Sequence, residues 1–422
     1  MSSRRIFLKS GALALITAGI GGVPTFVARA AQSHKLWSPY KKNKILICIF
    51  QRGAMDGLMA VTPFTDTYLQ KARPNLFLSA AKTANKPLID LDGRFGLHPS
   101  MNAFENLFRE KRLAIVHGVG SPNTTRSHFD AQDYMESGTP FSKGTDSGWL
   151  NRAVGLLGHE AATPFQAVSL TSALPRSFYG DQPAVAISNL EDFAIQMRGN
   201  PMATNTAAKS FEELYDNTSS TLLNKTGKES FEAMKMLKSA EIKNYKPANG
   251  AGYPVSPLGN SLKQLAQLIK MDVGLEVAFT ESGGWDTHYN QGAEIGTFSR
   301  NVGDLSNAIS AFWTDIGTMQ DDVEVMTMTE FGRTVRQNGS NGTDHGRASC
   351  MFILGNDVNG GKVHGSVPEL SIENLEDSRD LPVTTDFRVV FSEVASGHLK
   401  IANKSKLFPD WNGKNIGILK TA

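Results

Sequence analysis

Short apolar runs alternate with segments of helical periodicity along most of the chain. Apolar or alternating runs cover 45–50, 113–116, 168–170, 275–280, 323–329 and 350–354. Continuous runs of this kind are typical of strands buried on both faces of a parallel sheet. Apolar residues recur at helical spacing over 258–269, 298–316 and 387–395, and helices are also expected over 101–109 and 130–136. This order predicts an α/β fold with a mostly parallel central sheet sandwiched between helices.

The polar segment 201–253 interrupts that rhythm. It is rich in Lys, Glu and Asn and contains the helix-forming stretches SFEELYDN and SFEAMKMLKSAEIK. We therefore expect one large domain over 31–422, with a helical insertion at about 201–253, and no internal repeat.

The first 30 residues have the pattern of a twin-arginine export signal. Arg4 and Arg5 precede an apolar run over 12–27, and the segment closes with Ala28-Arg29-Ala30. The alternative, a membrane-spanning anchor, is disfavoured because the run is only about 16 residues long, rich in glycine and broken by Pro24. We predict cleavage after residue 30, a periplasmic or secreted protein with no stable membrane anchor after cleavage, and the twin-arginine export machinery as a transient partner.

Composition narrows the range of other partners and of redox chemistry. The chain carries 43 basic and 41 acidic residues, a net charge of +2, without a basic block after the leader. This balance argues against nucleic acid and anionic membranes as ligands.

The only cysteines, Cys48 and Cys350, lie in apolar runs. Buried free thiols are the commoner outcome there, and a disulfide between the two is the alternative that an oxidising compartment allows.

Charged side chains and histidines follow the ends of several expected strands. In open α/β sheets ligands bind just beyond the carboxyl ends of strands. Carboxylate oxygens and imidazole nitrogens at such a place are suitable ligands for a divalent ion such as Zn²⁺ or Ca²⁺. The candidate metal ligands are Asp56, Asp286, His288, Glu330, Asp344 and His345.

Each of these candidates also has a purely structural interpretation. Glu330 and Arg333 are spaced to form a surface ion pair, and His288 is placed to cap its glycine-bounded loop. Ser127 is a candidate nucleophile, but with Asp130 three residues later it also has the pattern of a helix N-cap. The chain contains no G-x-S-x-G, G-x-x-x-x-G-K-[ST] or H-E-x-x-H motif.

Five stretches together resemble one exported bacterial family. They are RGAMDGL at 52–58, RSHFDAQDYMESG at 126–138, GGWDTH at 283–288, TEFGR at 329–333 and TDHG at 343–346. In this order they resemble the family catalogued as domain of unknown function 1501, which is placed in the alkaline-phosphatase-like superfamily. The resemblance covers essentially the whole mature chain and implies the alkaline phosphatase/sulfatase fold.

The same resemblance implies roles for individual residues. Members of the superfamily hold two metal ions. By position, Asp56 resembles the aspartate after the first strand, Asp286 and His288 the middle Asp/His group, and His345 the late histidine. Ser127 lies near the place of the superfamily's nucleophile.

One position departs from the superfamily pattern. Glu330 stands where an Asp-His pair is expected, but the next residue is Phe331, so one imidazole is missing. Two hypotheses follow. The first is a metal-dependent hydrolase of phosphate or sulfate esters, in which Arg333 or Arg126 clamps the anionic group of a small ester substrate. The second is a noncatalytic, degenerate member that binds a ligand or an unknown partner in the periplasm.

Overall fold

The central sheet is mixed, with most strands running in one direction. The computed structural model describes residues 13–15, 43–159, 161, 163–190 and 245–420. Within these ranges the strand order is β1-β8-β7-β9-β2-β10-β11-β6-β12, with β13 beside β6. The strands are β1 (Leu13–Leu15), β2 (Ile45–Gln51), β6 (Leu113–Gly120), β7 (Ala167–Ser169), β8 (Val185–Ile187), β9 (Val277–Ser282), β10 (Val323–Met328), β11 (Ser349–Leu354), β12 (Val363–Gly365) and β13 (Thr385–Asp386).

Strand direction brings four chain segments to one edge of the sheet. The strands β8, β7, β9, β2 and β10 are mutually parallel. Since β11 is antiparallel to both β10 and β6, β6 points the same way as β10. The carboxyl ends of β2, β6, β9 and β10 therefore share an edge with the start of β11. The expectation of a mostly parallel sheet is confirmed, with β11 and the edge strand β1 as the antiparallel members.

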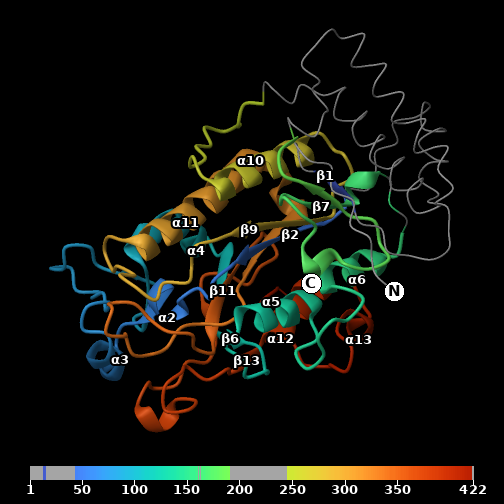
Figure 1. Cartoon of the computed structure of the whole chain (residues 1–422). Coiled ribbons are helices and arrows are strands. Elements are labelled where there is room, and N and C mark those ends of the chain that lie inside the picture. The colour runs from blue at the N-terminus through green and yellow to red at the C-terminus, as the bar shows by residue number, and fades with distance from the viewer. Residues whose placement is uncertain (1–12, 16–42, 160, 162, 191–244, 421–422) are drawn as a thin grey trace, which may run out of the picture.

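Helices cover both faces of this sheet (Figure 1). One face carries α4 (Ala103–Arg109), α10 (Pro257–Lys270) and α11 (Thr297–Ile316), and the other carries α5 (His128–Ser137), α6 (Trp149–Gly155), α12 (Phe387–Gly397) and α13 (Lys404–Leu407). The remaining elements are α2 (Gly57–Ala60), α3 (Thr67–Ala72), a small sheet of β3 (Val61–Pro63), β5 (Phe95–Leu97) and β4 (Ile89–Asp90), and 3-10 turns η1 (Pro99–Met101), η2 (Pro164–Gln166), η3 (Arg176–Phe178), η5 (Gly317–Asp322) and η6 (Ile372–Asn374).

The two apolar layers follow from the alternation of side chains along the buried strands. In β2, Ile47 and Ile49 pack towards α10 and α11, whereas Cys48 and Phe50 pack towards α12. Cys350 lies in the first of these layers, so the sheet separates it from Cys48. Both thiols are free and buried, and burial raises the pKa of each. The expectation of buried, unpaired thiols is confirmed.

A buried acid and a buried histidine meet at the opposite, amino-terminal edge of the sheet. Glu324, at the start of β10, is 1% exposed, and neither of its carboxylate oxygens has a hydrogen-bond partner within the described residues. His398 Nδ1, 3.5 Å from Glu324 Oε1, also lacks a hydrogen bond, while His398 Nε2 donates to the carbonyl of Ile45 at 2.9 Å. Burial, with the nearby charge of Asp357, raises the pKa of Glu324 to about 8, and burial lowers the pKa of His398 to about 4. Both groups are therefore neutral near pH 7.

Two sequence predictions concern segments that are only partly described. Arg4, Arg5 and the predicted cleavage point lie outside the described residues, although Leu13–Leu15 pairs with β8. Most of the predicted insertion, 201–244, also lies outside them, and its described end is not helical. The leader and the insertion stay predictions. Among the described residues, no helix combines the length and apolarity that a membrane crossing requires.

Candidate metal centre

The candidate residues converge where the carboxyl ends of the parallel strands meet. Gly53, just after β2, has φ +116°, and a Cβ there would lie 2.6 Å from the backbone nitrogen of Asp286. Only glycine allows this close approach of the two loops. The N–H of Gly53 in turn donates to Glu330 Oε1 at 2.8 Å. One turn thus fixes the ends of β2, β9 and β10 against one another.

A short antiparallel contact brings Asp344 and His345, the last two candidates along the chain, to the same place. Arg333 and His345 form a β-bridge, and the N–H of Gly332 donates to the carbonyl of Arg347 at 2.9 Å. A Cβ on Gly332 would lie 1.9 Å from the carbonyl oxygen of Ala348. The glycine is therefore required for the segment after β10 to lie against the segment before β11.

Three imidazoles and one carboxylate form the centre. His128 Nε2 and His288 Nε2 each lie 2.9 Å from His345 Nε2. Asp286 Oδ1 is 3.0 Å from His288 Nε2 and 3.2 Å from His345 Nε2, and Asp286 Oδ2 is 3.4 Å from His128 Nε2. The potential ligand atoms of His128, Asp286 and His345 all lie within 4.8 Å of one another. The structure thus brings together Asp286, His288 and His345, and adds His128.

The other ring nitrogen of each histidine faces an oxygen. Carboxylates and carbonyls only accept hydrogen bonds here, so each Nδ1 carries the proton. In the neutral ring the lone pair then lies on Nε2, which points into the cluster. The three contacts, each 2.9 Å long, are His128 Nδ1 to Glu330 Oε1, His288 Nδ1 to Asp344 Oδ1, and His345 Nδ1 to the carbonyl of Arg126.

Glu330 is a fully buried carboxylate that stays charged because donors surround it. Its side chain is 0% exposed, and Oε1 accepts from Gly53 N–H, from Gln132 Nε2 at 2.9 Å and from His128. Burial alone would raise the pKa of Glu330, but the hydrogen bonds of His128 and Gln132 hold that pKa below its usual value. The hydrogen bond between His128 and Glu330 also raises the pKa of His128. Glu330 therefore orients His128 and lies behind the cluster.

Arg333 is buried beneath Asp286. Its guanidinium is 0% exposed, and Nη1 donates to Asp286 Oδ1 at 2.7 Å. The rest of the group donates to the hydroxyl and the carbonyl of Thr343. Although burial opposes the shift, Arg333 lowers the pKa of Asp286. This placement makes Arg333 a support for Asp286, and its buried guanidinium is not accessible for the predicted role as a substrate clamp.

Asp56 lies beside the centre but is held by an arginine. Arg73 donates to its two carboxylate oxygens at 2.8 and 3.1 Å, and Gln291 Nε2 donates at 2.7 Å. The side chains of Asp56 and Arg73 are 1% and 2% exposed. Asp56 is therefore not brought together with the histidines, and a cationic side chain balances its charge.

Ser127 directly precedes His128 at the N-cap of α5. The residue is exposed, and its side chain makes no capping hydrogen bond. Its neighbours on both sides are fixed to the centre, Arg126 through the carbonyl that accepts from His345 and His128 through its ring. The position fits the N-cap interpretation, while the hydroxyl itself does not act as a cap.

His128 is the residue that sequence reasoning missed. It is not among the metal ligands predicted from the sequence, although it lies in the stretch 126–138 that contributes to the family resemblance. Its ring stacks on Phe331, with ring centroids 4.9 Å apart, and it supplies an imidazole next to the position that lacks one in the sequence pattern. The available signal was the neighbouring Ser127, which marks the start of a helix at the carboxyl end of a strand.

A family model described as "Protein of unknown function (DUF1501)" matches residues 43–410. The chain belongs to this family. The match spans every residue of the centre described above. No curated protein matches the sequence.

Solved structures similar to this DUF1501 chain include the following three. Ps i-CgsB, in complex with k-i-k-neocarrahexaose, has a TM-score of 0.40 and 8% identity, covering 89% of this chain and 76% of that one. PsFucS1 sulfatase from Pseudoalteromonas sp. has a TM-score of 0.38 and 10% identity, covering 94% and 76%. The C-terminal periplasmic domain of EcEptC from Escherichia coli, in complex with Zn, has a TM-score of 0.33 and 9% identity, covering 75% and 73%. Because all three TM-scores lie below 0.5, the likenesses say nothing about individual residues of the centre.

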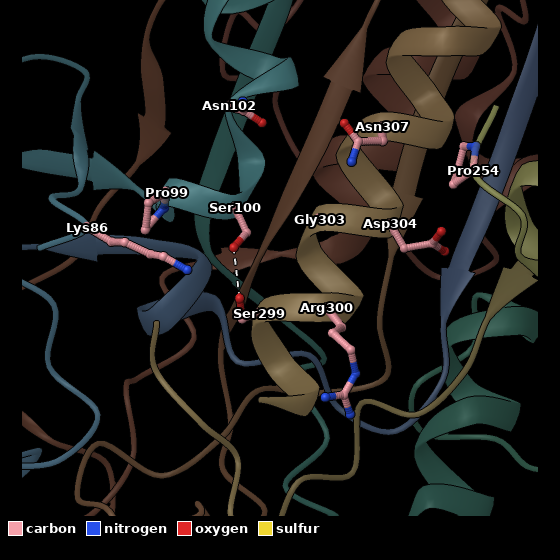
Figure 2. Close-up of a pocket in the computed structure, with 10 residues that line it drawn as sticks. All are labelled: Lys86, Pro99, Ser100, Asn102, Pro254, Ser299, Arg300, Gly303, Asp304 and Asn307. Atoms are coloured by element: carbon pink, nitrogen blue, oxygen red, sulfur yellow. Dashed lines mark hydrogen bonds between the residues drawn. The ribbon is translucent and has the colours of Figure 1, made fainter. Parts of the chain in front are cut away.

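A separate polar groove of about 630 Å³ lies between η1 and the first half of α11 (Figure 2). Ser100 and Ser299 point towards one another across it and are joined by a hydrogen bond of 2.8 Å. Lys86 and Arg300 contribute cationic side chains, and Gly303 leaves space on the helix. None of the candidate metal ligands lines this groove.

Proposed function

We propose that this DUF1501 protein is an exported, metal-dependent hydrolase of phosphate or sulfate esters. The observation that carries the proposal is the convergence of the Nε2 atoms of His128, His288 and His345 with Asp286, while each Nδ1 is held by an oxygen. Metal-binding histidines characteristically have their second nitrogen fixed in this way, which orients the ring and raises its basicity.

The donor set fits a divalent metal and favours zinc over calcium. His128 Nε2 and His288 Nε2 each lie 2.9 Å from His345 Nε2, so the three rings point at one place, where a shared cation would accept their lone pairs. Zn²⁺ takes imidazole nitrogen and carboxylate oxygen, whereas Ca²⁺ takes oxygen ligands. His128, Asp286 and His345 would hold the ion, with His288 as a further ligand. When bound, such an ion would act as a Lewis acid towards the ester oxygens and lower the pKa of a bound hydroxyl group or water.

The residues behind these ligands keep them in place. Glu330 and Asp344 fix the tautomers of His128 and His288, and Arg333 holds one oxygen of Asp286. Such supporting contacts usually change metal affinity or activity by about 10- to 100-fold when they are removed. Asp56 takes no part in this proposal, because Arg73 and Gln291 already bind its oxygens.

Ser127 is the candidate nucleophile. Its side chain is exposed, makes no capping hydrogen bond and follows directly on the residue whose carbonyl binds His345. A hydroxyl group becomes an effective nucleophile when a nearby cation lowers its pKa. In the proposed reaction the Ser127 hydroxyl loses its proton as its oxygen bonds to the phosphorus or sulfur, while the bond to the alcohol oxygen breaks and that oxygen takes up a proton. Water then cleaves the ester to Ser127, which restores the serine hydroxyl and releases phosphate or sulfate.

The second candidate function is noncatalytic binding of a ligand or a periplasmic partner. Phe331 favours it, because this apolar ring is 2% exposed and lies 5.1 Å from the ring of His345, centroid to centroid. No ligand atom is available at that position. A protein of this kind would bind metal without turning over esters.

Elemental analysis of the mature protein from the periplasm, combined with ester assays, tests the proposal. We expect stoichiometric transition metal, most of it zinc, and turnover of chromogenic phosphate or sulfate esters. His345→Gln should lose the metal, whereas the control His364→Gln should keep it, because His364 bonds the carbonyl of Asn359 away from the centre. Absence of metal in wild-type protein that has been offered Zn²⁺ would overturn the proposal.

Ser127→Ala tests the nucleophile, and the assay of the wild type separates the two functions. If Ser127 is the nucleophile, this variant should retain its metal and its folded stability but lose ester turnover. Retained turnover would rule out the serine, and stoichiometric metal without turnover of any ester by the wild type would favour the noncatalytic function.

A further inference from the structure

The proposed function requires a cationic group that binds the substrate's oxyanion. Arg333 does not serve, since its guanidinium is fully buried and bonded to Asp286 and Thr343. Arg126 is the other candidate: 27% of its side chain is exposed, and its backbone is tied to the centre because its carbonyl accepts the hydrogen bond of His345 Nδ1.

The guanidinium of Arg126 is bound unequally by two aspartates. Its Nε and Nη2 both donate to Asp380 Oδ2, at 2.9 and 2.5 Å, and Nη2 also donates to Asp377 Oδ2 at 2.7 Å. Asp380 is 0% exposed, whereas Asp377 is 66% exposed. The remaining nitrogen, Nη1, makes no hydrogen bond within the described part of the chain. Asp380 therefore anchors the group from the interior, and Asp377 covers one side of its outer edge.

We infer that Arg126 is the oxyanion-binding residue of this site and that Asp377 occupies its outer edge until a phosphate or sulfate group displaces it. This inference rests on the proposed function. The edge formed by Nη1 and Nη2 matches two oxygens of such a group, which is the bidentate geometry in which guanidinium binds tetrahedral anions best. Asp377 engages only Nη2. An incoming oxyanion accepts hydrogen bonds from both Nη1 and Nη2 of Arg126, while Arg126 loses only its exposed contact with Asp377.

The surrounding charges are balanced while Asp377 is bound. Arg347 pairs with Glu376 at 2.7 Å, and Arg379 pairs with Asp380 at 3.1 Å while also donating to the carbonyl of His345 at 2.7 Å. Together with Arg126 and Asp377, the network contains three guanidinium groups and three carboxylates. Release of Asp377 into solvent leaves one positive charge in the network without a partner, which favours an anion.

The turn that carries Asp377 allows a conservative test. Asp377 and Ser378 have φ values of 54° and 53°. Asparagine tolerates this left-handed conformation about as well as aspartate does. Asp377→Asn should therefore preserve the turn while removing the charge that competes with the ligand.

The experiment measures binding of inorganic phosphate and of sulfate to the metal-loaded protein by calorimetry. Exposed ion pairs are worth little, so we expect Asp377→Asn to bind either anion roughly two- to fivefold more tightly than wild type. Arg126→Lys, which keeps a cation for Asp380 but loses the guanidinium fork, should bind more weakly. Glu373→Gln is the matched control, because it removes a negative charge from the same segment without a contact to Arg126.

The outcomes separate this inference from the proposed function. Equal anion affinities for Asp377→Asn and Glu373→Gln, or unchanged affinity in Arg126→Lys, would overturn the inference even if the protein binds metal and hydrolyses esters. Conversely, tighter binding by Asp377→Asn in a protein that turns over no ester would support the anion site and leave the hydrolase proposal as the part that fails.

Discussion

The two ends of β10 hold buried glutamates with opposite ionisation behaviour. Glu330, just past the carboxyl end, is 0% exposed and has its pKa lowered, whereas Glu324, at the amino end, is 1% exposed and has its pKa raised to about 8. Each lies beside a histidine, at 2.9 Å for His128 and 3.5 Å for His398. Burial is the same for both, so it does not decide which glutamate is charged.

The difference lies in the number of donors that reach each carboxylate. Glu330 accepts from a backbone N–H, an amide and an imidazole, and these bonds offset the cost of removing its charge from water. Glu324 has no donor within the described residues and a negative neighbour in Asp357. The surroundings of Glu330 at the carboxyl edge thus stabilise a buried charge, whereas the surroundings of Glu324 at the amino edge disfavour one.

The largest expected effect comes from removing Glu330. Glu330→Ala leaves the donors of Gly53, Gln132 and His128 without their acceptor in a buried place, so we expect a loss of about 3 kcal/mol or more in the free energy of unfolding. Metal affinity should also fall by about 10- to 100-fold. Denaturant unfolding and metal titration measure the two effects. The control Glu281→Ala removes a 45% exposed partner of Arg52 and should cost under about 1 kcal/mol. Similar losses of unfolding free energy in Glu330→Ala and Glu281→Ala would contradict the conclusion that the buried donors make Glu330 special.

A smaller effect is expected from Glu324, with a defined pH dependence. Its pKa is higher in the folded protein than in the unfolded chain, so the stability it contributes is complete below about pH 4.5 and is lost as the pH rises towards about 8. The free energy of unfolding should therefore fall steadily as the pH rises through that window. Glu324→Gln mimics the neutral form and should become progressively more stable than wild type between pH 5 and pH 8. The measurement is the unfolding midpoint of both proteins across that range, and a constant difference would contradict the prediction.

The smallest expected effect concerns one donor of Glu330. Gln132→Ala removes the amide that links Glu330 to Arg52, with contacts of 2.9 and 3.0 Å, while Gly53 and His128 remain. We expect a cost of about 1 kcal/mol and a slightly higher pKa of Glu330. Thermal unfolding measures the first, and carboxyl-specific NMR titration measures the second. An effect as large as that of Glu330→Ala would show that the donors do not act independently.

Most of the fold was predictable because buried strands and amphipathic helices carry strong local patterns. The expected strand at 323–329 is β10, at Val323–Met328, and the expected helix at 298–316 is α11. The direction of β11 was not predictable, since a continuous apolar run is the same whether its neighbours run parallel or antiparallel. The charged residues and histidines after the expected strands also indicated correctly at which edge of the sheet the candidate centre lies.

The pairing of charges within that edge could not be predicted from the sequence. Asp56 has the position of a ligand, but its partner Arg73 comes from α3 and reaches it only through the tertiary fold. His128 and Glu330 are 202 residues apart, and nothing local marks one for the other. Local patterns therefore located the centre, while the choice of partners depended on long-range packing.

The arginine bound to Asp56 has a consequence for how the protein would respond to chelators. A bound ion can be stripped from its ligands, whereas the guanidinium of Arg73 is part of the chain and cannot dissociate from it. It also donates to the carbonyls of Thr334 and Val335, each at 2.8 Å, so it ties the end of β2 to the segment after β10. If the histidine cluster binds an ion as proposed, removing that ion would leave this carboxylate paired with Arg73 and the end of β2 still tied to the segment after β10.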